Sequence, residues 1–421
     1  MNIRKNTLWN LLGSAVPMLI GIGAIPYIYN EIGIERIGVL TIVWALIGYF
    51  SIFDFGLGRA ITQRIAGSAS KHNEQQENVT VTTGVYLTLA LGVFGGLLGI
   101  AAINVAGINW MNFDNKLSQE ISLSFFLACM AIPAATTTAG LRGVLEGKQR
   151  FKAINILKSL LGLSNFLAPV VSIVFFGPRL DYIVGALVLT RYIILVAHYS
   201  IVEMRIIQCW ENVRLEESRQ LFQFGGWMTL SNIVSPLMVV ADRFLIANVL
   251  GAAAVAYYTI PAEFMIRLLI LPAAVTTALF PVFSKNFSEN NYAESLQLYK
   301  SSVKAIFLMM GAICTFVFFG AEIGINAWLG PRFAEKSSAV TCVLAVGIFF
   351  NSIAQVPHAY IQASGDARST ALIHVFESIL YLPLLLLLMQ MHGILGAAIA
   401  WAARAMIDLI LLHAKAMRIC I

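Results

Sequence analysis

Long apolar stretches, separated by short polar loops, recur from one end of the chain to the other. A helix needs about 20 predominantly apolar residues to cross the hydrocarbon core of a bilayer. Such stretches lie near residues 7–30, 37–58, 81–106, 120–141, 154–177, 181–203, 222–249, 252–280, 302–328, 337–362, 371–391 and 393–415. The pattern predicts an all-α integral membrane protein with twelve transmembrane helices.

The composition supports this interpretation. Of the 421 residues, 58% are hydrophobic and only 12% are charged, and a soluble globular protein of this length does not have such a balance. The longest polar stretches, 63–78, 204–220 and 284–300, are too short for a separate folded domain. We interpret them as solvated connections on the cytoplasmic side, so any function has to reside in the membrane body.

Lysine and arginine are distributed unevenly between the two sides of the predicted bundle. With the N-terminus in the cytoplasm, nineteen of the 28 lie on the cytoplasmic side, five on the opposite side and four within spans. Positive charges are enriched in cytoplasmic loops, so the bias predicts that both termini are cytoplasmic. Because these residues are scattered through short loops, they do not indicate nucleic-acid binding.

The two halves of the sequence share a register of span boundaries. An offset of 218 residues pairs Gly33 with Gly251 and Thr41 with Thr259. Six spans in each half leave both halves in the same orientation, which predicts a parallel repeat with ligand space between two lobes. The predicted organisation is an N-terminal lobe over 1–203, a cytoplasmic linker over 204–221 and a C-terminal lobe over 222–421.

Charged residues within the seventh and eighth spans are the clearest functional signal. An ionisable group at membrane depth costs from about 2.5 to over 10 kcal/mol, so charges there indicate a wet or protein-lined interior. Asp242 and Arg243 are adjacent and therefore point in different directions, which disfavours mutual neutralisation. We interpret them as cavity residues, with Arg243 suited to binding anionic oxygens.

Two further pairs have helical spacing. Glu263 and Arg267 are four residues apart, as are Arg404 and Asp408, so each pair can meet on one helix face. Either these pairs only neutralise each other, or their arginines bind an anion while the acids tune charge or take up a coupling ion. Both interpretations remain open from the sequence.

Arg191 and Glu377 are predicted to be isolated deep charges, which are harder to explain by structure alone. The candidate binding residues are therefore Arg243, Arg267, Arg191 and Arg404. The candidates for ion coupling or charge tuning are Asp242, Glu263, Glu377 and Asp408.

Two pairs of residues are candidates for hinges or gates. Pro236 and Pro261 flank the Asp242–Arg243 pair and can kink their helices. Asp54 and Arg59 lie at the cytoplasmic end of the second span. The alternatives are a tolerated kink for each proline and a simple helix end for Asp54.

No cofactor is expected. The five cysteines include no CxxC spacing, the six histidines include no HExxH spacing, and no metal site is indicated. The sequence also contains no GxxxxGK[ST] phosphate loop of an ATPase. Uphill transport would draw on an ion gradient, with H⁺ or Na⁺ as candidate ions, on the membrane potential, or on consumption of the product.

Three segments resemble one family of membrane transporters. They are Asp242–Gly251 (DRFLIANVLG), Phe53–Arg64 (FDFGLGRAITQR) and Leu141–Phe151 (LRGVLEGKQRF). Together with the number and order of spans, they resemble the polysaccharide transporter family, which includes O-antigen flippases and belongs to the multidrug/oligosaccharidyl-lipid/polysaccharide exporter superfamily. The resemblance implies a V-shaped twelve-helix exporter fold in the bacterial inner membrane.

The resemblance also implies a function. Such a flippase, which is not an enzyme, moves an undecaprenyl-pyrophosphate-linked oligosaccharide from the cytoplasmic to the periplasmic leaflet by alternating access. Its cavity arginines would hold the pyrophosphate, and a polysaccharide polymerase and a chain-length regulator would be its partners. Lipid II flippases are expected to have two more C-terminal spans, which this chain lacks.

Two rival functions remain. An ion-coupled multidrug antiporter of the same superfamily would use the acids as ion and drug sites. A membrane polysaccharide polymerase or ligase would be expected to have a long periplasmic loop with paired functional residues, and every predicted periplasmic loop here is short.

Overall fold

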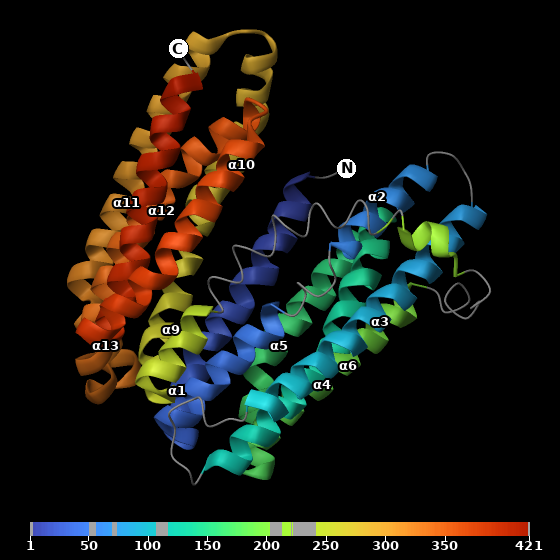
Figure 1. Ribbon diagram of the computed structural model, residues 1–421, viewed down its shortest axis with the longest axis vertical. Helices are drawn as coiled ribbons and strands as arrows, with labels where there is room; N and C mark the ends of the chain where they lie inside the picture. The colour runs from blue at the N-terminus through green and yellow to red at the C-terminus, as the bar shows by residue number, and fades with distance from the viewer. Residues whose placement is uncertain are drawn as a thin grey trace. The chain divides into compact units, whose positions relative to one another are not determined.

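The computed structural model describes residues 3–49, 56–69, 74–106, 117–202, 213–219, 221 and 241–419. These residues are almost entirely helical (Figure 1). They belong to two compact units, unit 1 (Met1–Val240) and unit 2 (Ala241–Ile421).

Each unit contains several long helices. Those of unit 1 are α1 (Ile3–Tyr49), α2 (Leu57–Ala69), α3 (Glu74–Ala106), α4 (Ser118–Gly147), α5 (Phe151–Phe176) and α6 (Leu180–Ile201). Those of unit 2 are α9 (Ala252–Arg267), α10 (Ile270–Ser288), α11 (Tyr292–Leu329), α12 (Pro331–Ala363) and α13 (Ala367–Ile419), preceded by a helical segment at 241–250. Eight helical stretches of the described residues are long and apolar enough to cross a membrane.

The helices follow the spans predicted from hydropathy. Helix α1 covers the first span and most of the second and is interrupted at Gly33, and α13 covers the last two and is interrupted at Gly393. Both glycines have positive φ angles, 81° and 60°, a conformation that costs glycine little because it has no Cβ. The seventh predicted span, 222–249, is described only from residue 241 onward.

The glycines paired by the predicted repeat share a backbone conformation. Gly33 has φ 81° and ψ 170°, and Gly251 has φ 89° and ψ 169°. Each therefore breaks a helix in the same way at matching points of the two halves. The predicted lobe boundary near residue 222 lies outside the described residues and stays a prediction.

Helix α4 is central to unit 1, where it packs against α2, α3 and α6. Apolar side chains from these helices form a buried cluster that includes Ile61, Val81 and Val144. Leu221, from the predicted linker, is fully buried in the same cluster. In unit 2, α12 is the helix packed against α9, α10, α11 and α13.

The predicted linker is anchored to unit 1 by Glu217. This side chain is only 5% exposed and accepts hydrogen bonds from Arg64 Nε (3.0 Å) and Nη2 (2.7 Å), Gln76 Nε2 (3.0 Å) and Thr80 Oγ1 (2.8 Å). The expectation of a fully solvated connection over 204–220 is therefore wrong at Glu217. A buried carboxylate needs such donors, and α2 and α3 supply them.

The Glu217 anchor should be sensitive to both mutation and pH. Burial raises the pKa of Glu217, but the hydrogen bonds from Arg64, Thr80 and Gln76 outweigh this and hold the pKa below its ordinary value of 4.5. The carboxylate therefore stabilises docking at pH values above 4.5, and this contribution is lost as the pH falls through the lowered pKa. We expect Glu217→Gln to weaken docking by about 2 kcal/mol at neutral pH, because it removes charge-assisted hydrogen bonds.

Hydrogen exchange of residues 213–219 in the purified protein measures this docking. The matched control is Glu216→Gln, because Glu216 is an exposed neighbour on the same helical turn. Equal exchange in the two variants would contradict the anchoring role.

Candidate functional site

Asp242 lies at the centre of a polar cluster inside unit 2. Its side chain is 4% exposed, and the Tyr381 hydroxyl donates a hydrogen bond to its Oδ2 over 2.7 Å. Its Oδ1 has no hydrogen-bond partner among the described residues. An acid of the seventh predicted span is thus held by a tyrosine of the eleventh.

Arg243, the neighbour of Asp242, forms an ion pair with Glu263 of α9. The Arg243 side chain is 6% exposed, whereas that of Glu263 is 45% exposed. The pairing of Glu263 with Arg267, which their spacing allows, is not observed among the described residues. Because Arg243 is the more strongly desolvated cation, it has the greater need of a carboxylate, whereas Arg267 is partly exposed at the end of α9.

Arg404, on the second half of α13, lies beside Tyr381. Its Cζ atom is 5.6 Å from the centre of the Tyr381 ring, which is within the range of a cation–π contact. Arg404 also interacts electrostatically with Asp242 and Glu377. The structure thus brings the predicted site residues Asp242, Arg243 and Arg404 together.

Glu377 and Asp408 form a pair of acids in the same cluster. Glu377 is 2% exposed and Asp408 is 9% exposed, and Glu377 interacts with both Asp408 and Arg404. Their proximity shows that the halves of α13 run antiparallel on either side of Gly393. The prediction that Glu377 is isolated was therefore wrong, because its partner lies across this hairpin.

Two histidines extend the cluster, and sequence reasoning missed both. His374 Nε2 lies 3.5 Å from Asp408 Oδ1. The ring of His374 stacks on that of His358 from α12, with centroids 5.5 Å apart and planes 9° apart. The signal was present, because residues 374, 377 and 381 follow the i, i+3, i+7 spacing of one helix face.

The other predicted arginines lie elsewhere. Arg191 is in unit 1, where its Nη2 lies 3.5 Å from Asn165 Oδ1 of α5. Arg267 is the last residue of α9. Arg59 is exposed on α2.

Only some of the proposed hinge and gate residues are among the described residues. Asp54 and Pro236 lie outside the described residues. Pro261 is buried within α9, which continues past it to Arg267. The interruption between α9 and α10 follows Arg267, at Leu268 and Leu269.

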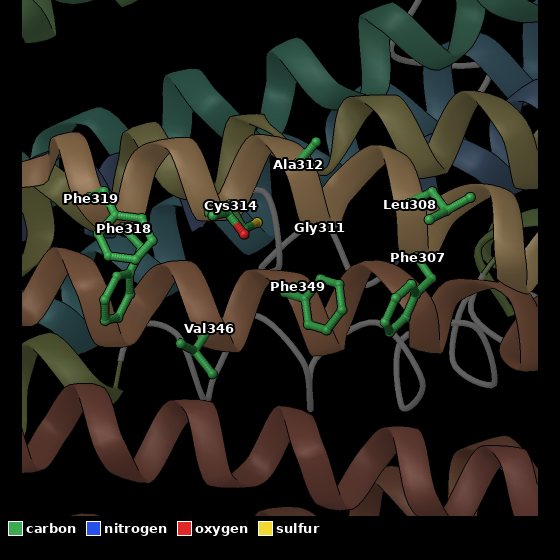
Figure 2. A pocket seen from close by; sticks show the side chains of 10 residues that line it. Phe307, Leu308, Gly311, Ala312, Cys314, Phe318, Phe319, Val346 and Phe349 are labelled. Carbon is green, nitrogen blue, oxygen red and sulfur yellow. The ribbon is translucent and has the colours of Figure 1, made fainter.

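An apolar hollow of about 540 Å³ lies along α11 and α12 (Figure 2). Figure 2 shows Phe307 and Phe349 near each other at one end and Phe318 and Phe319 at the other. The ring centroids of Phe307 and Phe349 are 5.2 Å apart. The side chains that line the hollow include no charged group and are suited to contact with hydrocarbon. The hollow is therefore distinct from the polar cluster.

Comparison with known proteins establishes the family. Residues 3–287 match the family described as polysaccharide biosynthesis protein, and residues 228–387 match the family named MatE. The full chain is 35% identical to a Shigella flexneri protein described as an O-antigen transporter, with 99% of that protein covered. It is also 21% identical to the lipopolysaccharide biosynthesis protein WzxC of Escherichia coli, with 98% of this chain and 81% of that protein covered.

Solved structures show the same fold at low sequence identity. An inward-facing multidrug resistance MATE family transporter of the MOP superfamily aligns with a TM-score of 0.81, at 14% identity and with 98% of each chain covered. The lipid II flippase MurJ in an inward closed conformation aligns with a TM-score of 0.76, at 12% identity, over 97% of this chain and 87% of that one.

The predicted all-α, exporter-like membrane fold is confirmed. The long apolar helices and the full-length similarity to a transporter show a multi-pass membrane transporter. The chain belongs to the polysaccharide biosynthesis protein family of the MOP superfamily.

The pairing of Glu263 can be tested by double-mutant cycles of protein stability. For Arg243 and Glu263 we expect a coupling of about 1–3 kcal/mol, because removing one partner leaves the other uncompensated at membrane depth. For Glu263 and Arg267 we expect less than about 0.5 kcal/mol, because they are not in contact. Unfolding of the purified protein in detergent measures both coupling energies. A larger coupling energy for Glu263 and Arg267 than for Arg243 and Glu263 would show that Glu263 pairs with Arg267 instead.

Proposed function

We propose that the protein is a flippase, not an enzyme, for a lipid-linked oligosaccharide. It would move an undecaprenyl-pyrophosphate-linked O-antigen or polysaccharide repeat unit from the cytoplasmic to the periplasmic leaflet of the bacterial inner membrane. The observation that carries this proposal is the full-length similarity to a protein described as an O-antigen transporter. The arginines of unit 2 support it, because an anionic headgroup needs cationic partners in order to cross.

Arginines are the proposed ligands of the pyrophosphate. Their planar guanidinium groups donate paired hydrogen bonds to phosphate oxygens. Arg267 is partly exposed at the end of α9, and Arg243 is ion-paired with Glu263, a half-exposed residue of the same helix α9. In this proposal a phosphate displaces the Glu263 carboxylate from Arg243.

The remaining candidates are assigned supporting roles. Arg404 would offset part of the negative charge of the buried acids Asp242, Glu377 and Asp408, while Arg191 would contribute a positive charge in the first lobe. Arg59 and Pro261 remain proposed as gate and hinge.

Alternating access between the two lobes is the proposed movement. Transfer of a bare pyrophosphate through hydrocarbon would be prohibitive, so the charged headgroup and sugars would occupy an aqueous space while the polyprenyl tail stays in lipid. Both termini would be cytoplasmic, as the distribution of lysine and arginine predicts. The exposed product would then be available to a polymerase and a chain-length regulator.

An ion-coupled multidrug antiporter is the second candidate, and the match of residues 228–387 to the MatE family favours it. This function predicts that deletion increases drug sensitivity and leaves long-chain polysaccharide intact. The flippase proposal predicts that deletion leaves drug sensitivity unchanged and abolishes long-chain polysaccharide.

Replacement of the proposed headgroup ligands distinguishes these functions. In a deletion strain, we expect Arg243→Ala and Arg267→Ala each to reduce surface polysaccharide about 10- to 100-fold, because each removes charged hydrogen bonds worth about 1.5–3 kcal/mol. The lipid-linked unit should accumulate at the same time. Gel analysis of polysaccharide and mass spectrometry of the lipid fraction measure the two effects at matched protein levels.

The control is Arg332→Ala, because Arg332 is an exposed arginine in the first turn of α12. Normal polysaccharide in both cavity variants would remove these arginines from the mechanism.

A further inference from the structure

The apolar hollow on α11 and α12 lies within two stretches that are long and apolar enough to cross a membrane. Its aromatic side chains are open to their surroundings, since Phe307 is 51% exposed and Phe319 is 78% exposed. Phe307 packs against Phe349 at one end, and Phe318 packs against Phe319 at the other (Figure 2). The volume of about 540 Å³ is typical of sites that bind small molecules. The hollow is therefore large enough to hold part of an apolar ligand.

The aromatic lining is not repeated at the matching positions of the first half of the chain. The offset of 218 residues between the two halves pairs Glu74, the first residue of α3, with Tyr292, the first residue of α11. The positions that match the four phenylalanines are occupied by Leu89, Ile100, Ala101 and Ala131. The rings are therefore not required by the repeated helical scaffold, which indicates a task specific to unit 2.

The depth of the hollow suits a ligand of the cytoplasmic leaflet. From Phe307 to Phe319 it extends about 18 Å along α11, at 1.5 Å per residue. Phe307 lies five residues inside the predicted span 302–328, and in the predicted orientation that span begins on the cytoplasmic side. The hollow therefore covers the cytoplasmic leaflet and the middle of the membrane. This is the leaflet from which the proposed flippase takes its substrate.

An aromatic contact links the helix that carries the hollow to the proposed headgroup ligands. Beyond the hollow, α11 continues to Trp328, whose ring centroid lies 4.5 Å from that of Phe264 in α9. Phe264 is next to Glu263, the partner of Arg243, and less than one turn before Arg267. A long lipid tail in the hollow would thus leave its phosphate end within reach of these arginines.

A polyprenyl chain suits this hollow better than a straight acyl chain. Each isoprene unit carries a methyl branch, so the chain is broader, and dispersion contacts are lost wherever a ligand leaves a gap. The aromatic rings offer large apolar faces to such a chain. We propose that the hollow binds the polyprenyl tail of the lipid-linked substrate. The inference rests on the proposed function and deepens it by assigning the tail a lipid-facing site on unit 2.

Photolabelling of the purified full chain in lipid nanodiscs tests the site. The probe is undecaprenyl phosphate with a diazirine group in its tail, and mass spectrometry identifies the labelled residues. We expect labels within 307–319 of α11 and 346–349 of α12. We expect Phe319→Ala to weaken binding about tenfold, because each buried methylene-sized group contributes about fourfold in affinity. The matched control is Phe316→Ala, which removes a ring of α11 that is 80% exposed and does not line the hollow.

A second pair of variants fills the hollow instead of enlarging it. A Cβ atom at Gly311 would lie 3.5 Å from the Phe349 ring, whereas a Cβ atom at Gly324 would have no heavy atom within 4 Å among the described residues. We therefore expect Gly311→Leu to weaken probe binding and Gly324→Leu, on the same helix, to leave it unchanged. Thermal unfolding of each variant confirms that it is folded.

Three outcomes would overturn the proposal. They are labels outside the hollow, equal probe affinity in Phe319→Ala and Phe316→Ala, or displacement of the probe by dioleoyl phosphatidylglycerol as readily as by unlabelled undecaprenyl phosphate. The last result would make the hollow a general lipid site. Normal transfer of the lipid-linked oligosaccharide by a protein that binds the probe elsewhere would contradict this inference alone. Probe binding in the hollow without any transfer would contradict the flippase proposal alone.

Discussion

The free-energy cost of a charge without a partner at membrane depth organises unit 2. Two arginines among its described residues have anionic or aromatic neighbours: Arg243 has Glu263, and the partly buried Arg404 has Tyr381 and the nearby acids. The acids are in excess, so any change in protonation or ligand binding must redistribute these contacts.

Hydropathy predicted the helices well because lipid is a simple solvent. A spanning segment must be long, apolar and internally hydrogen-bonded, so the spans are visible in the sequence. The breaks between spans at Gly33 and Gly251 are visible as well. The partners of the charged residues were less predictable, because helix rotation and packing are tertiary properties. Glu263 met Arg243 on a neighbouring helix instead of Arg267 on its own, and Glu377 met Asp408 only because the chain folds back at Gly393.

The partners of a charged residue outside the predicted spans, Glu217, were equally hard to predict from the sequence. Glu217 lies in a polar stretch that was read as a solvated connection, yet α2 and α3 surround its carboxylate with donors. No local pattern distinguishes such a residue from an exposed glutamate such as Glu216. His374 could have been found by testing which side chains share a helix face with Glu377, because the search for metal spacing alone does not detect it. His358 lies on a different helix, α12, and that test would not find it.

We propose that this protein transfers a polyprenyl-pyrophosphate-linked oligosaccharide between leaflets. The most direct measurement uses proteoliposomes that contain such a labelled lipid in both leaflets, together with an impermeant glycosidase added outside. In vesicles that contain the protein, we expect the glycosidase to digest the labelled lipid of both leaflets. In protein-free vesicles we expect it to digest the outer-leaflet fraction alone. Equal digestion in the two preparations, with the protein folded and inserted, would contradict it.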